Sequence, residues 1–410
     1  MPVNLNTIPG PALRPLPPKP LRWLSTLVGL IATGILLMRF LGKLVGETSF
    51  WWFAIGIPVL FWVVLIGFRL TVYIMQQIHA NAWDKRREQV ILQEVRRGRR
   101  ALQILAAEHR TALVAKAQFT DTTDALLRNE DILFSQTSWN GQSSVRHSRL
   151  PDSVDVLPQT QVSSAFAELL QTLTEPLSHL PQDNPVAVLL ESSSSLPVAQ
   201  VRDLWQQAWL ESDLTPHMAF IPGHGLMAID HWLDYSIQDK AVLLVIALQI
   251  APRQPDNTAE TVTGLLLGNR ITQTTLPPIA LLHRPELSRP DPIALQEKID
   301  QAIDWVPLQA TALQHLWLVG IPGTSEGYQC AIVAQANPPL ASVDPATGIH
   351  NINEFLGNPG RAAPWLAIAA AAQAIRQSPA PHMIISGEQD SDSVWSTVVS
   401  PYASHKENNA

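Results

Sequence analysis

Two long runs of apolar residues lie near the start of the chain, and shorter apolar runs recur at regular intervals from about residue 186 onward. The first long run covers residues 23 to 38, the second covers residues 50 to 68, and neither contains a charged side chain. A helix that crosses a membrane needs about 20 apolar residues. The two runs therefore predict a transmembrane hairpin, residues 23–68, with spans at about 21–40 and 50–69.

The first apolar run can also be compared with a secretory signal peptide. It is longer than the roughly 7–15 apolar residues of a signal-peptide core, and no small-residue cleavage site follows it. We therefore expect an anchor that is kept. Residues 1–22 precede it and include "PGPALRPLPPKP", which predicts an extended proline-rich arm that serves either as a flexible lead-in or as a recognition tail.

Residues 69–117 have the composition of a helix that continues out of the membrane. The segment has no proline, a single glycine, and apolar residues at steps of three, four and seven. This spacing predicts an amphipathic helical stalk. The stalk carries a basic cluster that would bind anionic lipid head groups, contact the acidic remainder of the chain, or stay solvated and set the membrane topology. The cluster consists of Arg96, Arg97, Arg99 and Arg100.

A polar stretch, residues 118–160, predicts a linker, and beyond it apolar runs alternate with segments of helical spacing. The runs are continuous, which is typical of strands buried on both faces. Strands that alternate with helices of this length predict an α/β sheet covered by helices, residues 161–400, followed by a polar tail at 401–410. We expect strands at 186–192, 217–222, 240–250, 261–271, 315–324 and 382–387, and helices at 198–212, 223–237, 294–306 and within 355–375.

The distribution of charge also separates the N-terminal hairpin and stalk from the rest of the chain. Residues 1–110 contain 14 Lys and Arg against 5 Asp and Glu, whereas the remaining 300 residues contain 14 against 30. Basic residues flank the apolar hairpin, so the positive-inside rule predicts that both termini and the acidic body lie in the cytoplasm. A single cysteine, Cys330, agrees with a reducing compartment and excludes an intramolecular disulfide. The acidic body lacks the basic surface that nucleic acid requires, so we expect no nucleic-acid partner.

The order of the predicted elements resembles that of the thiolase and β-ketoacyl synthase superfamily. The resemblance covers roughly residues 160 to 400 and rests on three stretches, "MAFIPGHGLMAIDHWLDYSIQDKAVLLVIALQI", "TAETVTGLLLGNRI" and "FLGNPGRAAPWLAIAAAAQAI". It implies a layered, thiolase-like sheet-and-helix domain. In that family the first stretch opens a helix at the nucleophilic cysteine, and the third forms a turn with a catalytic histidine before a helix of small residues.

The positions that carry the chemistry in that family hold other residues in this sequence. Gly223 and His224 stand near the expected nucleophile, and Asn358 and Gly360 stand near the expected late histidine. Thiolase-type condensation needs a thiolate and imidazole groups that move protons. The resemblance therefore implies a degenerate active site in a pseudoenzyme whose fold is reused for binding. Because His224 has no second ligand at metal spacing, we expect no metal site, and we expect no cofactor.

From these features we expect a non-catalytic, protein-binding component anchored in a bacterial inner membrane. The layout also resembles membrane proteins described as virulence factors or effector adaptors of type VI secretion systems. This resemblance implies a secretion effector or an apparatus component as the partner, besides membrane lipids. Two alternatives remain open. One is a membrane-tethered enzyme of acyl transfer or lipid metabolism with a non-cysteine mechanism, based on His224 or the serine run 192–195. The other is a structural self-dimer that pairs through an edge strand.

Overall fold

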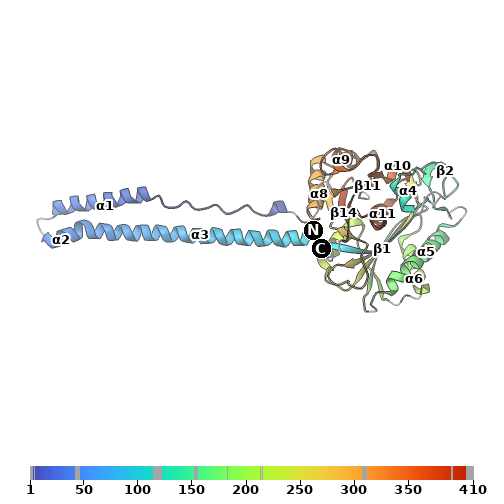
Figure 1. The fold of residues 1–410 in the computed structure, drawn as a ribbon, viewed down its shortest axis with the longest axis horizontal. Helices are drawn as coiled ribbons and strands as arrows, with labels where there is room; N and C mark the ends of the chain where they lie inside the picture. Colours follow the sequence, from blue (N-terminus) through green and yellow to red (C-terminus); the bar gives the residue numbers. More distant parts are fainter. Residues whose placement is uncertain are drawn as a thin grey trace. The chain divides into compact units, whose positions relative to one another are not determined.

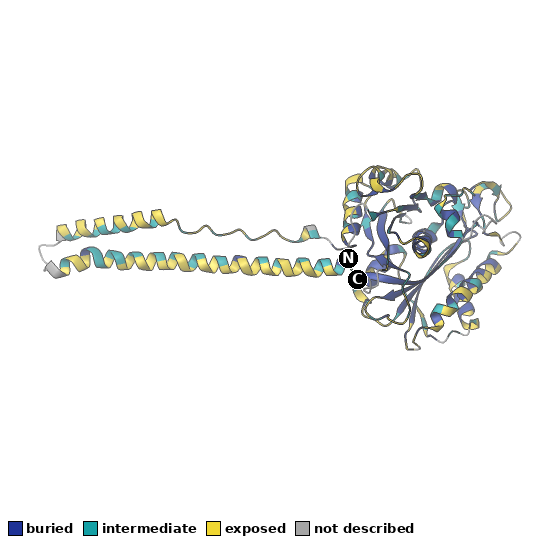
Figure 2. Ribbon diagram, viewed as in Figure 1, coloured by how far each residue is buried: buried dark blue, intermediate teal, exposed yellow. Residues whose placement is uncertain are grey.

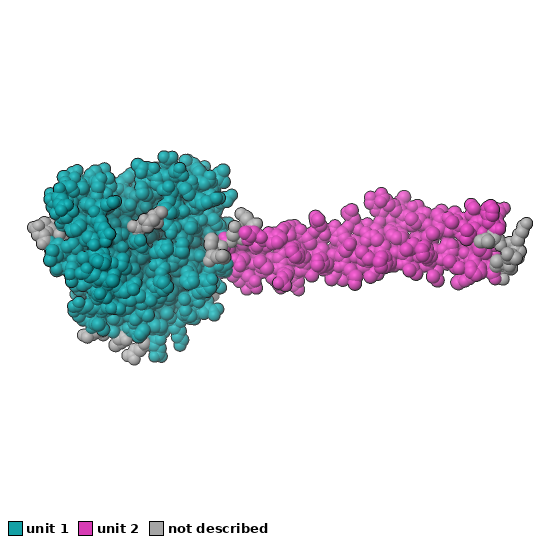
Figure 3. All heavy atoms as spheres, turned by 180° about the vertical axis from the view of Figure 1, so that it is seen from behind, with its two compact units in different colours: residues 1–2, 97–410 teal, residues 3–96 magenta. Residues whose placement is uncertain are grey.

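The computed structural model describes residues 3, 5–41, 47–113, 122–151, 156–181, 183–212, 214, 216–306, 312–388 and 391–402. The chain divides into two compact units (Figure 3). The described residues within 3–96 form the helical unit, and those within 97–410 form the body.

The helical unit is built from two long apolar helices. Helix α1 spans Pro20–Leu41. After α2 (Glu47–Trp51), one π turn (Trp52–Gly56) leads into α3, Ile57–Gly98 (Figure 1). Figure 2 shows that much of the surface of these helices is exposed, and the exposed side chains include many large apolar ones.

By length and composition, two helices among the described residues are able to cross a membrane, Pro20–Phe40 and Ser49–Gly98. The second is far longer than the roughly 20 residues that a bilayer needs, so its polar second half extends past the apolar run. The two apolar helices agree with the predicted hairpin.

The proline-rich arm lies along the polar half of α3, within the helical unit. The Ala12 backbone N–H donates to the Asp84 carboxylate at 2.8 Å, and Arg14 pairs with the same carboxylate at 2.7 Å. Trp83 and Arg87 donate hydrogen bonds to backbone carbonyl groups of the arm. The arm is extended, as its prolines predict, and it is bound to the helix rather than being a free lead-in.

The helix that continues from the second apolar run ends before the end of the predicted stalk, residues 69–117. Helix α3 ends at Gly98, and Ala101–Arg110 forms strand β1. Nearly every residue of β1 is buried because the strand lies between two other strands. Its apolar residues therefore do not alternate, and they also match helical spacing. Residues 69–117 are thus not one helical stalk, and the body begins at residue 97 rather than at residue 161.

Within the described residues, eleven strands of the body form one sheet. They are β1, β4 (Val186–Ser194), β5 (Met218–Phe220), β6 (Val242–Ile250), β8 (Thr261–Asn269), β9 (Ala280–His283), β10 (Glu286–Ser288), β11 (His315–Val319), β12 (Ile349–Asn351), β13 (His382–Gly387) and β14 (Val394–Pro401). The strand order is β12-β11-β13-β14-β9-β1-β8-β6-β4-β5, and β10 pairs with β14. Strand β1 pairs with β8 on one side and β9 on the other, so it joins two half-sheets.

Much of the predicted linker is also part of the body. Strands β2 (Ser135–Thr137) and β3 (Ser144–Ser148) pair with each other, and β3 pairs with β7 (Thr258–Ala259). Residues 118–121 and 152–155 of the predicted linker lie outside the described residues. The described part is therefore not a linker, because it forms a small second sheet with β7.

Helices cover the sheet in layers. They are α4 (Thr122–Leu127), α5 (Pro158–Ser178), α6 (Val198–Glu211), α7 (Gly225–Tyr235), α8 (Pro292–Asp304), α9 (Glu326–Gln335), α10 (Ile352–Phe355) and α11 (Ala363–Gln377). Helices α5 and α6 pack on one outer face, α8 and α9 pack on the other, and α7 and α11 lie in the core between the half-sheets (Figure 1). The body is therefore a layered α/β fold of helix, sheet, helix, sheet and helix, as the sequence predicts.

The same succession of elements occurs twice in the body. The first half contains β4-α6-β5-α7-β6-β8, and the second contains β11-α9-β12-α11-β13-β14. In each half the first three strands are parallel, with the earliest strand in the middle, and the last strand is antiparallel to its neighbour. Helices α7 and α11 therefore occupy equivalent places in the two halves.

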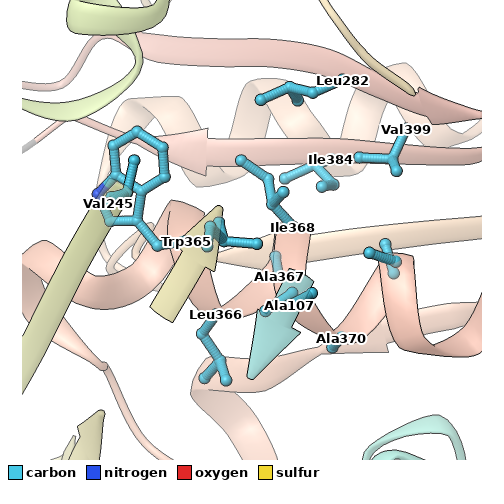
Figure 4. Packing of buried hydrophobic residues seen from close by; sticks show 14 of the residues in the cluster. Ala107, Val245, Leu282, Trp365, Leu366, Ala367, Ile368, Ala370, Ile384 and Val399 are labelled. Atoms are coloured by element: carbon cyan, nitrogen blue, oxygen red, sulfur yellow. The ribbon is translucent and has the colours of Figure 1, made fainter. Parts of the chain in front are cut away.

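Helix α11 is buried along most of its length. Twelve of its residues are buried, and more than half of these are alanine. Figure 4 shows α11 packed among side chains of both half-sheets, with Ala107 and Val245 from one and Leu282, Ile384 and Val399 from the other. Small side chains allow strands on both sides to approach the helix closely, which explains the run of alanines in this segment.

Candidate functional site

One cleft of the body gathers ionisable side chains from both halves. It has a volume of about 210 Å³ and lies at the carboxyl ends of β4 and β13 and at the amino ends of α7 and α11. Ligands of α/β sheets usually bind at the carboxyl ends of the strands. The cleft is lined by Glu191, His224, Arg361, Ser386 and Glu388, among others.

Glu191 connects the end of β4 to the start of α7. Its Oε1 atom accepts hydrogen bonds from the Gly225 backbone N–H at 2.8 Å and from Trp365 Nε1–H at 2.9 Å. Burial raises the pKa of this carboxyl group, and the two donors and the charge of Arg361 oppose that rise only in part. A carboxyl group with a raised pKa in the wall of a cleft is characteristic of functional sites.

His224 stands opposite a carboxylate that comes from the second half. It precedes the first turn of α7 in an extended conformation, and its side chain is 58% exposed. Its Nε2 atom lies 3.7 Å from Glu388 Oε1. The other oxygen of Glu388 accepts a hydrogen bond from Trp395 Nε1–H at 3.0 Å, which orients the carboxylate. An exposed imidazole beside an oriented carboxylate can accept a proton and be stabilised as imidazolium.

The cleft also holds a hydroxyl group that the fold does not use. Ser386 is fully buried, and its Oγ atom has no hydrogen-bond partner among the described residues. A buried hydroxyl without a partner destabilises the folded protein, so its presence in the wall of a cleft calls for a ligand. This hydroxyl is available to donate a hydrogen bond to an oxygen atom bound in the cleft.

The structure brings only two of the four predicted site residues together. His224 and Gly360 line the cleft. Gly223 lies outside its wall, with φ of +131°, a backbone conformation that favours glycine. Asn358 lines a different cavity, and its Oδ1 atom accepts a hydrogen bond from the Gly360 backbone N–H at 2.9 Å. Asn358 therefore shapes the turn before α11 instead of contacting a ligand in the cleft.

Four cleft residues were not among the predicted site residues, namely Glu191, Arg361, Ser386 and Glu388. Glu191 is nevertheless a charged residue directly after the apolar run 186–190, and a carboxylate at the carboxyl end of a buried strand is a signal that can reveal it. The same signal applies to Glu388. The predicted strand 186–192 is two residues longer in the structure, because β4 continues to Ser194 and includes most of the serine run.

The predicted basic cluster divides into two parts. Arg96 and Arg99 are exposed. Arg97 donates two hydrogen bonds to the Asp234 carboxylate, at 2.8 and 2.5 Å, and Arg100 donates to the Leu233 carbonyl at 2.9 Å. Contact with the acidic body, one of the three expected roles, therefore holds for two of the four arginines.

A buried ion-pair network surrounds the same aspartate. Arg284, which is fully buried, pairs with both Asp230 and Asp234 of α7. Burial raises the pKa of Asp234, but hydrogen bonds from Arg97 and Arg284 outweigh this effect and lower the pKa overall. Buried charges are tolerated when they are paired, so this network fixes the carboxyl-terminal half of the helix that presents His224.

No protein-family model and no curated protein matches the sequence. Among solved structures, the ishigamide ketosynthase/chain length factor is 15% identical, with a TM-score of 0.52 over 74% of this chain and 100% of that chain. Human mitochondrial 3-ketoacyl-CoA thiolase is 8% identical, with a TM-score of 0.47 over 75% of this chain and 100% of that chain. A type II ketosynthase in complex with its acyl-carrier protein is 12% identical, with a TM-score of 0.48 over 74% and 99%. The body has the thiolase-like fold that the resemblance implies.

The comparisons overturn the expectation of a non-catalytic secretion adaptor. The solved structure with a TM-score above 0.5 carries the name of a ketosynthase/chain length factor, ketosynthases are enzymes, and nothing in that name concerns secretion. Among the described residues, His224, Glu388 and Glu191 line the cleft, and no cysteine lines it. The predictions of a pseudoenzyme and of a chain that is not an enzyme are therefore wrong, and the alternative of an acyl-transfer enzyme agrees better with the findings.

Proposed function

We propose that this chain is an acyl-transfer enzyme that works without a cysteine and uses His224 to move the proton. One observation carries the proposal. A single cleft brings together an exposed imidazole, a carboxylate 3.7 Å away and a buried hydroxyl group without a partner among the described residues. These are the groups that proton transfer and stabilisation of a carbonyl oxygen require.

In the proposed step, His224 accepts the proton from the O–H, N–H or S–H group of an acceptor while the acceptor atom attacks the acyl carbon. A bond forms between the acceptor atom and the acyl carbon, and the bond from that carbon to the leaving atom of the donor breaks. The imidazolium then returns its proton to the leaving atom, so protons and electrons balance. Glu388, oriented by Trp395, stabilises the imidazolium between the two transfers.

Two further residues support this step. The Ser386 hydroxyl donates a hydrogen bond to the carbonyl oxygen as negative charge develops on it. Glu191 holds the Gly225 N–H and therefore keeps the start of α7, where His224 stands, at a fixed place beside β4. Glu191 acts in this scheme as a positioning residue.

We further propose that the enzyme is anchored in a bacterial inner membrane, with both chain termini in the cytoplasm and membrane lipids around the apolar hairpin. Two helices long and apolar enough to span a bilayer support the anchor. The excess of basic residues on either side of the hairpin supports the orientation.

The test uses the full chain in detergent micelles, because β1 follows α3 directly and belongs to the central sheet. Thiol release from acetyl-CoA, as a probe donor, is followed with and without simple acceptors. We expect His224→Ala to lower the rate by about 10²–10⁴-fold, the usual contribution of a general base. Glu388→Gln should cause a smaller loss.

His231→Gln is the matched control, because His231 lies on the same helix and is exposed outside the cleft. Its rate should equal that of the unchanged protein. The proposal fails if the unchanged protein releases no thiol from any short acyl thioester, or if His224→Ala keeps the full rate.

A further inference from the structure

A second cavity of about 400 Å³ lies beside the candidate cleft, and Arg361 lines both. It is formed at the carboxyl ends of the neighbouring parallel strands β4 and β6 and at the amino end of α6. No acidic side chain lines it among the described residues, although acidic residues outnumber basic ones 30 to 14 beyond residue 110. A cationic cavity in an acidic body points to an anionic ligand.

The two arginines of this cavity are not used to hold the fold together. The Arg361 backbone N–H donates to Ser193 Oγ at 3.0 Å, which fixes the main chain. In the part of the chain that the structure describes, neither the Arg361 guanidinium nor that of Arg253 makes a hydrogen bond or an ion pair, and Arg253 is exposed. Two guanidinium groups in one cavity repel each other, and a bound anion would convert this repulsion into attraction.

Three successive hydroxyl groups line the cavity between the arginines and α6. Ser193 Oγ and Ser194 Oγ accept backbone hydrogen bonds, from Arg361 N–H and from Leu196 N–H at 3.3 Å, so their own hydrogens remain to be donated. Ser192 Oγ is buried and has no partner among the described residues. Helix α6 begins without a side-chain cap, which adds backbone N–H groups to the donors at this end of the cavity.

We propose that this cavity binds the phosphoryl group of a small organic ligand, with Arg253 and Arg361 as the cationic contacts and the serine hydroxyls as further donors. Planar guanidinium groups match the oxygen geometry of phosphate and bind it with two hydrogen bonds each. The cavity volume is within the roughly 300–1,000 Å³ of small-molecule sites, so there is room for more of the ligand than its phosphoryl group.

Because Arg361 lines both cavities, a ligand bound in the second cavity can extend into the candidate cleft. A ligand held by its phosphoryl group in the second cavity directs its remaining atoms past Arg361 toward His224. This last step rests on the proposed acyl transfer, whereas the phosphoryl site itself does not.

The test measures binding without turnover. The full chain in detergent is titrated with inorganic phosphate, glycerol 3-phosphate and ADP at constant ionic strength, with chloride as the reference, and the heat of binding is recorded. Each phosphate-bearing ligand should bind more tightly than chloride. Arg253→Ala and Arg361→Ala should each weaken the binding by about tenfold, the loss expected when one charge-assisted contact is removed.

Arg202→Ala is the matched control. It removes the same charge from α6, but Arg202 lies over the Phe220 ring, 4.9 Å from its centre, and outside the cavity wall. Phosphate that binds no tighter than chloride, or an Arg202→Ala loss equal to that of Arg253→Ala, overturns the proposal. Tight phosphate binding without acyl turnover supports this site and removes only the proposed function, and turnover without phosphate binding does the reverse.

Discussion

The two halves of the body share one strand order, yet they hold their central helices in different ways. In the first half, α7 is held by charges, because buried Arg284 pairs with Asp230 and Asp234. In the second half, α11 is held by apolar packing of twelve buried residues. The half that uses charges is the one that presents the exposed imidazole of His224.

This difference shows how one topology can serve two purposes. Hydrophobic burial is non-directional, so it stabilises α11 without strict control of its rotation. A guanidinium group that pairs with two carboxylates fixes both the rotation of a helix about its axis and its position along that axis. A helix that must present a reacting group at its amino end benefits from the second type of contact.

The half-sheets differ as well, at the amino ends of their parallel strands. Strands β11 and β13 begin with the paired residues His315 and His382, whereas β4 and β6 begin with the paired valines Val186 and Val242. Strand β12 adds His350. His315 Nδ1 lies 3.0 Å from His350 Nε2, and the His350 ring also contacts Asn129 Oδ1 at 3.0 Å. Burial lowers the pKa of His350 to about 3.

The largest expected loss of stability comes from a substitution that removes the charged contact of α7 in the first half. Arg284→Met removes one buried partner from each of Asp230 and Asp234. We expect the free energy of unfolding to fall by about 3–5 kcal/mol, since two carboxylates of the body lose a buried counter-charge. Denaturant titration of the full chain in detergent measures this loss. Arg289→Met, at an exposed position, should leave stability nearly unchanged, and an equal effect of both variants would contradict the role of the network.

The second largest expected loss of stability comes from a substitution that disturbs the apolar packing of α11 in the second half. Ala370 of α11 is fully buried between the half-sheets (Figure 4), so Ala370→Leu has to displace its neighbours. We expect a loss of about 1–3 kcal/mol, the usual cost of overpacking a core. Ala199→Leu, at an exposed position of α6, is the control and should cost little. Equal losses for the two variants would show that α11 is not closely packed.

The smallest expected effect concerns the pH dependence of stability. It tests whether a buried histidine of the second half-sheet causes the loss of stability at low pH. The ordinary pKa of His350 is 6.5 and its folded pKa is about 3, so the unfolded chain binds the proton between these values and stability falls as pH drops from 6.5 toward 3. Between pH 6.5 and 5.5, the free energy of unfolding should fall by about 1 kcal/mol less in His350→Gln than in the unchanged protein. Unfolding curves at the two pH values measure it. The exposed variant His217→Gln should retain the full pH response, and an unchanged response in His350→Gln would contradict this assignment.

Long apolar runs made much of the fold predictable from the sequence. The run 240–250 corresponds to β6, the run 382–387 to β13, and the helical spacing of 198–212 to α6. Strand β1 was not predictable, because residues buried on both faces of a strand also fit a helix. Short strands such as β9 and β12 hold too few residues to show a period at all.

The candidate site was predictable only in part. The helix start at His224 and the turn at Gly360 follow from local pattern and from the resemblance to the thiolase superfamily. The pairing of His224 with Glu388 joins residues 164 positions apart, and the orphaned Ser386 hydroxyl is visible only once its neighbours are known. Such features depend on tertiary structure, which one sequence without its fold does not display.

The place of β1 in the chain has a practical consequence for anyone who wants the body without its anchor. This strand is made immediately after α3, but its partners β8 and β9 leave the ribosome about 150 to 180 residues later, so the two half-sheets are united late in synthesis. A truncated version that starts after Arg110 would lack the strand that unites them. A soluble fragment for crystallisation should instead begin before Arg97, which keeps both β1 and the arginine contacts to Asp234.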